Sequence, residues 1–90
     1  MSGQQYWIEA SGDTTLSTAE VHAGVSAAAE LADTLGTTLA DADRAAREEI
    51  DCGNDNGPAC ALWCRLESRA VETATDGWHR TPDDLSLVPA

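Results

Sequence analysis

Two glycines, Gly36 and Gly53, constrain the fold most, because they divide residues 17–75 into three segments with apolar residues at helical spacing. Ser17–Glu20 matches a capping box, in which the serine and glutamate side chains each accept a free backbone N–H group at a helix start. A glycine just after the last apolar residue is typical of a left-handed helix stop. Pro58 suits the first position of a helix, where its missing N–H is not needed. The sequence therefore predicts three helices, over residues 17–35, 37–52 and 58–75.

Each predicted helix carries an apolar face toward the core. The first face holds Val21, Val25, Ala28, Leu31, Ala32 and Leu35. The second holds Leu39, Ala42, Ala46 and Ile50. The third holds Ala59, Leu62, Trp63, Leu66, Ala70 and Ala74, with Cys60, Cys64 and Val71 about 100° further round the helix. The third helix is thus expected to contact two surfaces, one of them an arm, the tail or a partner.

The short link at Gly36 predicts that the first two helices pack as an antiparallel hairpin over residues 17–52. The fold class expected is all-α, with this hairpin and the third helix (58–75) forming one domain over residues 17–77. The arm 1–16 holds the apolar cluster Tyr6-Trp7-Ile8, which is too short for an independent strand. The tail 78–90 contains two prolines and is expected to be extended.

The charge is strongly one-sided, with 16 carboxylates against five arginines, no lysine and a net charge of −11. Such a chain repels phosphate backbones, which argues against direct binding of nucleic acid or an anionic membrane. It fits a partner with a basic surface, although acidity also serves solubility alone. No apolar run approaches the roughly 18 residues of a membrane span, and residues 1–17 lack the basic and apolar regions of a secretory signal. A cytoplasmic location is therefore expected.

Three cysteines, Cys52, Cys60 and Cys64, leave three alternatives open. They can be reduced and buried as small apolar residues. Cys52 can form a disulfide with Cys60 or Cys64, which would stabilise a domain with a small hydrophobic core. They can also bind a metal, although their spacing matches no common zinc or iron–sulfur pattern and a fourth ligand such as His79 would lie about 22 Å along the helix from Cys64. No cofactor is otherwise indicated.

No nucleophile–base set, phosphate loop or nucleophile elbow is present in the sequence, so we expect no enzymatic activity. Ninety residues with a large share of alanine bury little apolar area, which favours a partner or a homo-oligomer. The candidate partner anchors are Tyr6, Trp7, Trp78 and Val71. The leading hypothesis is a small acidic protein-interaction module, a regulator, inhibitor or assembly subunit, that binds through the third helix and the aromatic arms. The alternatives are a redox or metal-responsive protein using the cysteines, and an acidic mimic of nucleic acid.

Overall fold

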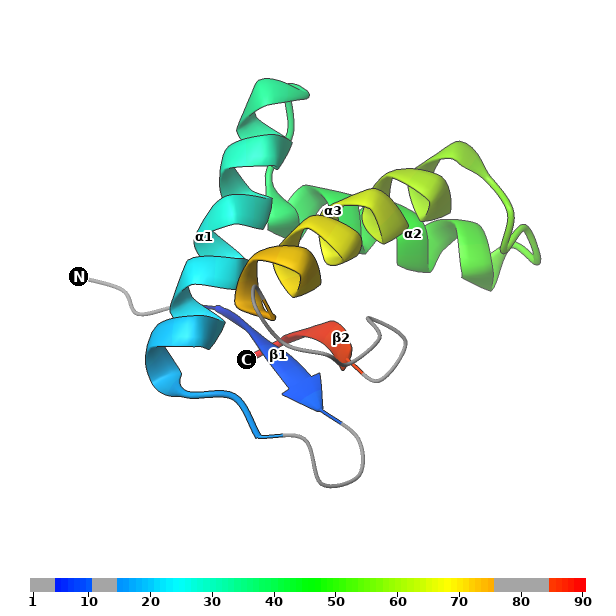
Figure 1. Ribbon diagram of the computed structural model, residues 1–90. Helices are drawn as coiled ribbons and strands as arrows, with labels where there is room; N and C mark the ends of the chain where they lie inside the picture. The colour runs from blue at the N-terminus through cyan, green and yellow to red at the C-terminus, as the bar shows by residue number, and fades with distance from the viewer. Residues whose placement is uncertain (1–4, 11–14, 76–84) are drawn as a thin grey trace.

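The structure, a computed structural model, describes residues 5–10, 15–75 and 85–90 (Figure 1). Within these ranges the chain forms three helices and two short strands. In chain order they are β1 (Tyr6–Ala10), α1 (Thr18–Thr34), α2 (Leu39–Asp51), α3 (Pro58–Ala74) and β2 (Leu85–Pro89). The three predicted helices are confirmed, whereas the predictions for Trp78 and His79 and the predicted domain end at residue 77 lie outside the described residues.

The helix ends form for the reasons that the sequence indicates. The Ser17 hydroxyl accepts a hydrogen bond from the Glu20 N–H at 3.1 Å, and the Glu20 carboxylate accepts one from the Ser17 N–H at 2.8 Å, so the capping box is complete. Gly36 (φ 82°) and Gly53 (φ 84°) follow the ends of α1 and α2 in the left-handed region, which suits glycine. These features fix the lengths of α1 and α2.

The predicted pairing of the first two helices is wrong. α3 lies beside α2 as its antiparallel neighbour and also packs across α1, whereas α1 and α2 contact each other little (Figure 1). The reason is the small-residue face of α1, with Gly24, Ala28 and Ala32 all buried, which lets α3 approach closely. On α3, the side chains of Leu66 and Ala70 are completely buried. The central helix is therefore the third and not a partner of a 17–52 hairpin.

The arm and the tail are not only extended but paired, so the predicted all-α class omits a small sheet. β1 and β2 are antiparallel, with Tyr6 opposite Pro89 and Ile8 opposite Leu87. Neither strand is stable alone, but each satisfies the other's backbone groups and buries alternate side chains against the helices. The buried side chains of the sheet are Tyr6, Ile8, Leu85 and Leu87. Glu67 of α3 fixes β2 further, because its carboxylate accepts the Leu87 N–H at 3.1 Å.

Gly24 marks the closest approach of α1, α3 and β1. A Cβ atom at this position would lie 2.5 Å from the Ala70 carbonyl oxygen and 2.6 Å from Cδ1 of Ile8. Both distances are shorter than real Cβ contacts allow, and the first involves backbone that cannot rotate away. Glycine is therefore required here by packing and not by its backbone angles.

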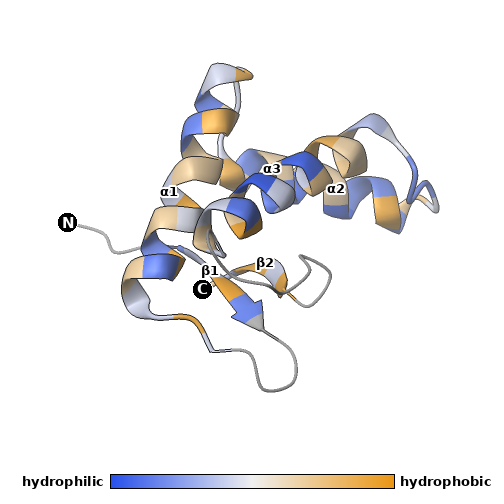
Figure 2. Ribbon diagram, in the orientation of Figure 1, coloured by the Kyte–Doolittle hydropathy of each residue, from blue (hydrophilic) through white to orange (hydrophobic). Residues whose placement is uncertain are grey.

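The helices carry hydrophobic and hydrophilic stretches in alternation, as expected for elements with one packed side (Figure 2). Ile50 departs from its predicted core position and is 56% exposed, because it lies in the last turn of α2 while Leu39, Ala42 and Ala46 are covered. Within the described ranges, no helix has the length and apolar character needed to cross a bilayer.

Replacing Gly24 with alanine tests the close approach. Overpacking typically costs about 1–3 kcal/mol, and we expect about 2–3 kcal/mol here because the Ala70 backbone must shift. The better helix propensity of alanine returns about 1 kcal/mol. We expect G24A to lower the free energy of unfolding by about 1–2 kcal/mol in urea denaturation. The matched variant A23G, at an exposed neighbour, measures the propensity effect alone at about 1 kcal/mol. A G24A protein as stable as the parent would contradict the packing.

Candidate binding groove and the free cysteines

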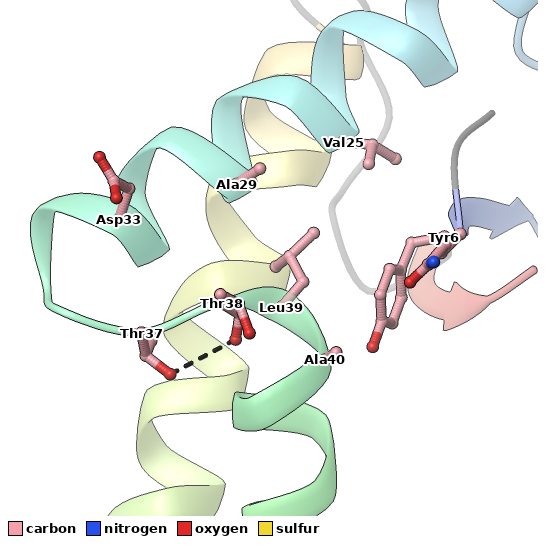
Figure 3. Close-up of a pocket in the computed structure, with 9 residues that line it drawn as sticks. Tyr6, Val25, Ala29, Asp33, Thr37, Thr38, Leu39 and Ala40 are labelled. Carbon is pink, nitrogen blue, oxygen red and sulfur yellow. Dashed lines mark hydrogen bonds between the residues drawn. The ribbon is translucent and has the colours of Figure 1, made fainter. Parts of the chain in front are cut away.

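A groove of about 360 Å³ lies where β1, the C-terminal half of α1 and the start of α2 meet (Figure 3). Val25 and Leu39 are buried and form its apolar floor, and Tyr6 of β1 closes one end. Ala29 lies on the α1 wall, and Asp33 lies at the end opposite Tyr6. The remaining lining residues are Gln5, Thr37, Thr38 and Ala40. The groove thus joins an apolar floor to a carboxylate at one end.

The polar groups of the groove differ in how far they are already engaged. Thr38 is the N-cap of α2, and its hydroxyl accepts the Asp41 N–H at 3.1 Å. The Thr37 hydroxyl donates to the Thr38 carbonyl at 3.4 Å, a long contact drawn in Figure 3. Asp33 is exposed and forms no ion pair with any described residue. Asp33 is therefore the groove's available charged group.

Tyr6 forms the closed end of the groove. Its ring packs against Trp63 of α3, with centroids 6.0 Å apart and planes at 51°, an arrangement that stabilises aromatic pairs. Burial, and next the negative charge of Asp43, raise the pKa of the Tyr6 hydroxyl, so it is neutral at pH 7. The ring therefore supplies a rigid, uncharged wall.

The four predicted anchors have different positions. Tyr6 is 7% exposed and Val71 is 1% exposed, so both belong to the core of this chain. Trp7 is 40% exposed beside Val88 on the outer side of the sheet, and Trp78 lies outside the described residues. Only the C-terminal part of the wide apolar face of α3 is buried by elements of the same chain, whereas Cys60 is half-buried and Cys64 is exposed. Tyr6 and Val71 are consequently not surface anchors in this structure.

The groove was not predicted from the sequence. Asp33 reads as part of a solvated stripe on α1, and Ala29 carries no chemical signal of its own. They form a site only because β1, which precedes α1 in the chain, brings Tyr6 to them. The one local indication was the aromatic cluster in the N-terminal arm.

All three cysteines are free thiols. Cys52 and Cys64 are exposed, and Cys60 is half-buried, with its thiol donating to the Ala46 carbonyl at 3.6 Å. Cys60 and Cys64 line a pocket of about 170 Å³ with Asp55. Among the residues whose positions are described, no group of three or more His, Cys, Asp and Glu side chains is arranged to bind a metal ion.

The region around Cys60 is organised by Glu49. The N-cap residue of α3, Gly57, has no side chain to accept the first N–H groups, and the Glu49 carboxylate of α2 accepts them instead. Its oxygens accept the N–H groups of Ala59 and Cys60, each at 2.9 Å. A Cβ on Gly57 would lie 2.4 Å from a Glu49 oxygen, so glycine leaves room for this tertiary cap.

This cap sets the charge state of both groups. The hydrogen bonds from Ala59 and Cys60 lower the pKa of Glu49, outweighing the opposing effect of its partial burial. Burial, and then the neighbouring Glu49 carboxylate, raise the pKa of the Cys60 thiol. Cys60 is therefore protonated at neutral pH, which disfavours it as a nucleophile or metal ligand.

No protein-family profile matches the chain, and no curated protein or solved structure matches it. The features of this chain that bear on its function are therefore the groove, the exposed side chains and the charge.

Replacing Glu49 with glutamine tests the cap through its pH dependence. Because the folded pKa of Glu49 is lowered, its contribution to stability is complete above the usual carboxyl pKa of about 4.3 and is lost as pH falls through the folded value. We expect E49Q to lower the Tm at pH 7 and to converge with the parent in acid. E48Q, at the exposed neighbouring position, should change neither the Tm at pH 7 nor the dependence of Tm on pH. A pH-independent difference between E49Q and the parent would contradict the cap.

Thiol modification tests the placement of the cysteines. A thiol-reactive reagent at pH 7 should modify Cys52 and Cys64 first, and Cys60 last because its thiol is half-buried and protonated. Intact mass should show two fast adducts and one slow adduct, and C60A should lose only the slow one. Three adducts formed at one rate would show that the arrangement is wrong.

Proposed function

We propose that this chain is a small, acidic, non-enzymatic protein-interaction module, a regulator, inhibitor or assembly subunit of a basic protein partner. In this proposal the groove receives one apolar side chain of the partner, and Asp33 pairs with a lysine or arginine beside it. The supporting observation is the groove itself, which combines a buried apolar floor with a carboxylate that has no described ion-pair partner.

The size of the groove supports an occupant of one large side chain. Its volume of about 360 Å³ lies at the lower end of the range of about 300–1,000 Å³ for ligand pockets. Complete burial of one large apolar side chain contributes about 1.5–3 kcal/mol. Tyr6, Val25 and Leu39 are held by the core, so the floor needs no rearrangement before binding.

The charge of the chain supports a basic partner. The net charge of −11 favours association with a positive surface and repels an acidic one. Asp33 is exposed, so its pairing with a partner cation is expected to contribute only about 0.2–1 kcal/mol. The apolar contact therefore supplies most of the affinity, and the carboxylate supplies selectivity.

Trp7 is a candidate for a second contact. It is the most exposed aromatic side chain of the described residues, and tryptophan is enriched among residues that dominate binding energies. It lies on the outer side of the sheet, whereas its neighbour Tyr6 points inward to the groove. The proposed surface thus differs from the one expected from the sequence, since Val71 and its neighbours Leu66 and Ala70 on α3 are buried.

Selection of peptides tests the proposal without a known partner. Random twelve-residue peptides displayed on phage and selected on the folded chain should be enriched for one large apolar residue close to arginine or lysine. We expect A29M, which fills the groove, to weaken a selected peptide more than tenfold, and D33N to weaken it about twofold to fivefold. A29M has the larger effect because the apolar contact supplies most of the proposed affinity.

Two matched variants serve as controls on the same helix. A23M adds the same side chain, and E30Q removes one carboxylate, at exposed positions that do not line the groove. Neither should change peptide affinity by more than about twofold. Peptides that are unaffected by A29M and D33N, or a selection that enriches no sequence, would overturn the proposal.

A further inference from the structure

Two arginines of α3 stand apart from the other described arginines. Arg44 pairs with Asp41 at 2.5 Å, and Arg47 pairs with Asp43 at 3.0 Å. Arg65 and Arg69 form no ion pair with any carboxylate in the described ranges. In a chain with 16 carboxylates and five arginines, two adjacent guanidinium groups without a described counter-charge need an explanation.

These two arginines line one pocket of about 290 Å³ together with Ser68, Glu72 and Leu31. The four α3 residues are spaced at 65, 68, 69 and 72, which places them along one side of the helix. Leu31 of α1 is partly buried and supplies an apolar wall. The pocket and the groove share no lining residue, so the two sites are separate.

We propose that Arg65, Ser68 and Arg69 bind one phosphate dianion, either as the free ion or as the phosphate group of a monoester. Like charges one turn apart on a helix repel each other, and a dianion between them converts that repulsion into two attractions. Guanidinium groups match the oxygens of phosphate in geometry, and a serine hydroxyl can donate a further hydrogen bond. Two arginines on a chain of net charge −11 can bind a single phosphate group, whereas a backbone with many phosphates would be repelled.

Glu72 fixes where in the pocket the phosphate binds. It lies one turn toward the C-terminus from Ser68 and Arg69, and its carboxylate repels an anion. In this proposal the phosphate lies between the two guanidinium groups, on the Arg65 side of the pocket, away from Glu72. This placement makes Glu72 an opposing charge whose removal strengthens binding.

The experiment is an NMR titration of the full ¹⁵N-labelled chain. The probes are inorganic phosphate, a capped Ala-phosphoserine-Ala peptide and the same peptide without phosphate. We expect saturable shifts of the Arg65 and Arg69 side-chain N–H groups and of the Ser68 amide, at millimolar concentrations, with phosphate-bearing probes alone. A tighter response to the phosphopeptide assigns the source to a phosphorylated protein, and a tighter response to inorganic phosphate assigns it to the free ion.

Charge-matched variants decide whether the site is specific. R65Q and R69Q should each weaken binding about threefold to tenfold, and E72Q should strengthen it. R44Q removes the same charge from α2 and should leave binding unchanged. Equal weakening by R44Q and R65Q, no gain with E72Q, or no saturation by either phosphate-bearing probe below about 10 mM would overturn the proposal.

Discussion

The close approach of α1, α3 and β1 at Gly24 is the constraint on which the rest of the structure depends. A side chain there would collide with the Ala70 carbonyl and the Ile8 side chain at once. Because Gly24 has no side chain, α3 lies directly on α1, and β1 packs against both helices. Because Ile8 is held at this crossing, Tyr6 two residues earlier is held on the same side of β1. The packing at Gly24 thereby fixes the position of Tyr6, which forms one wall of the groove.

The same arrangement explains how a short chain with few large apolar residues closes its core. The two strands cover helix surfaces that would otherwise be exposed, and Glu67 anchors β2 by accepting the Leu87 N–H. Among the described residues, the open features include the groove beside Asp33, the exposed Trp7, the pocket of Arg65 and Arg69, and the pocket of Cys60 and Cys64. Leu66, Ala70 and Val71 of α3 are buried within the chain, so the proposed partner binds instead at the groove where three elements meet. Under the two proposals, the net charge of −11 favours a basic partner at the groove and a single small anion at the arginine pocket.

Local chemistry made the helices predictable from the sequence. The Ser17 capping box, the stops at Gly36 and Gly53 and the start at Pro58 each act within a few residues, so the sequence pattern contains the whole interaction. Interactions between distant segments were not predictable in the same way. The pairing of the arm with the tail joins opposite ends of the chain, and the preference of α1 for α3 depends on how closely small residues approach in three dimensions. The Glu49 cap shows the same limit, because the acceptor for α3 lies on another helix and Gly57 contributes only space.

The contacts of Gly24 can be measured directly in the folded chain. In a nuclear Overhauser spectrum, we expect cross-peaks from the Gly24 α-protons to the δ1 methyl of Ile8 and the methyl of Ala74. A Cβ at this glycine would lie 2.6 Å from the Ile8 carbon and 3.0 Å from the Ala74 carbon. Helical chemical shifts over α1 and α3 without these cross-peaks would contradict this packing. That result would mean that the helices form but do not meet at Gly24, and that the groove has no fixed wall.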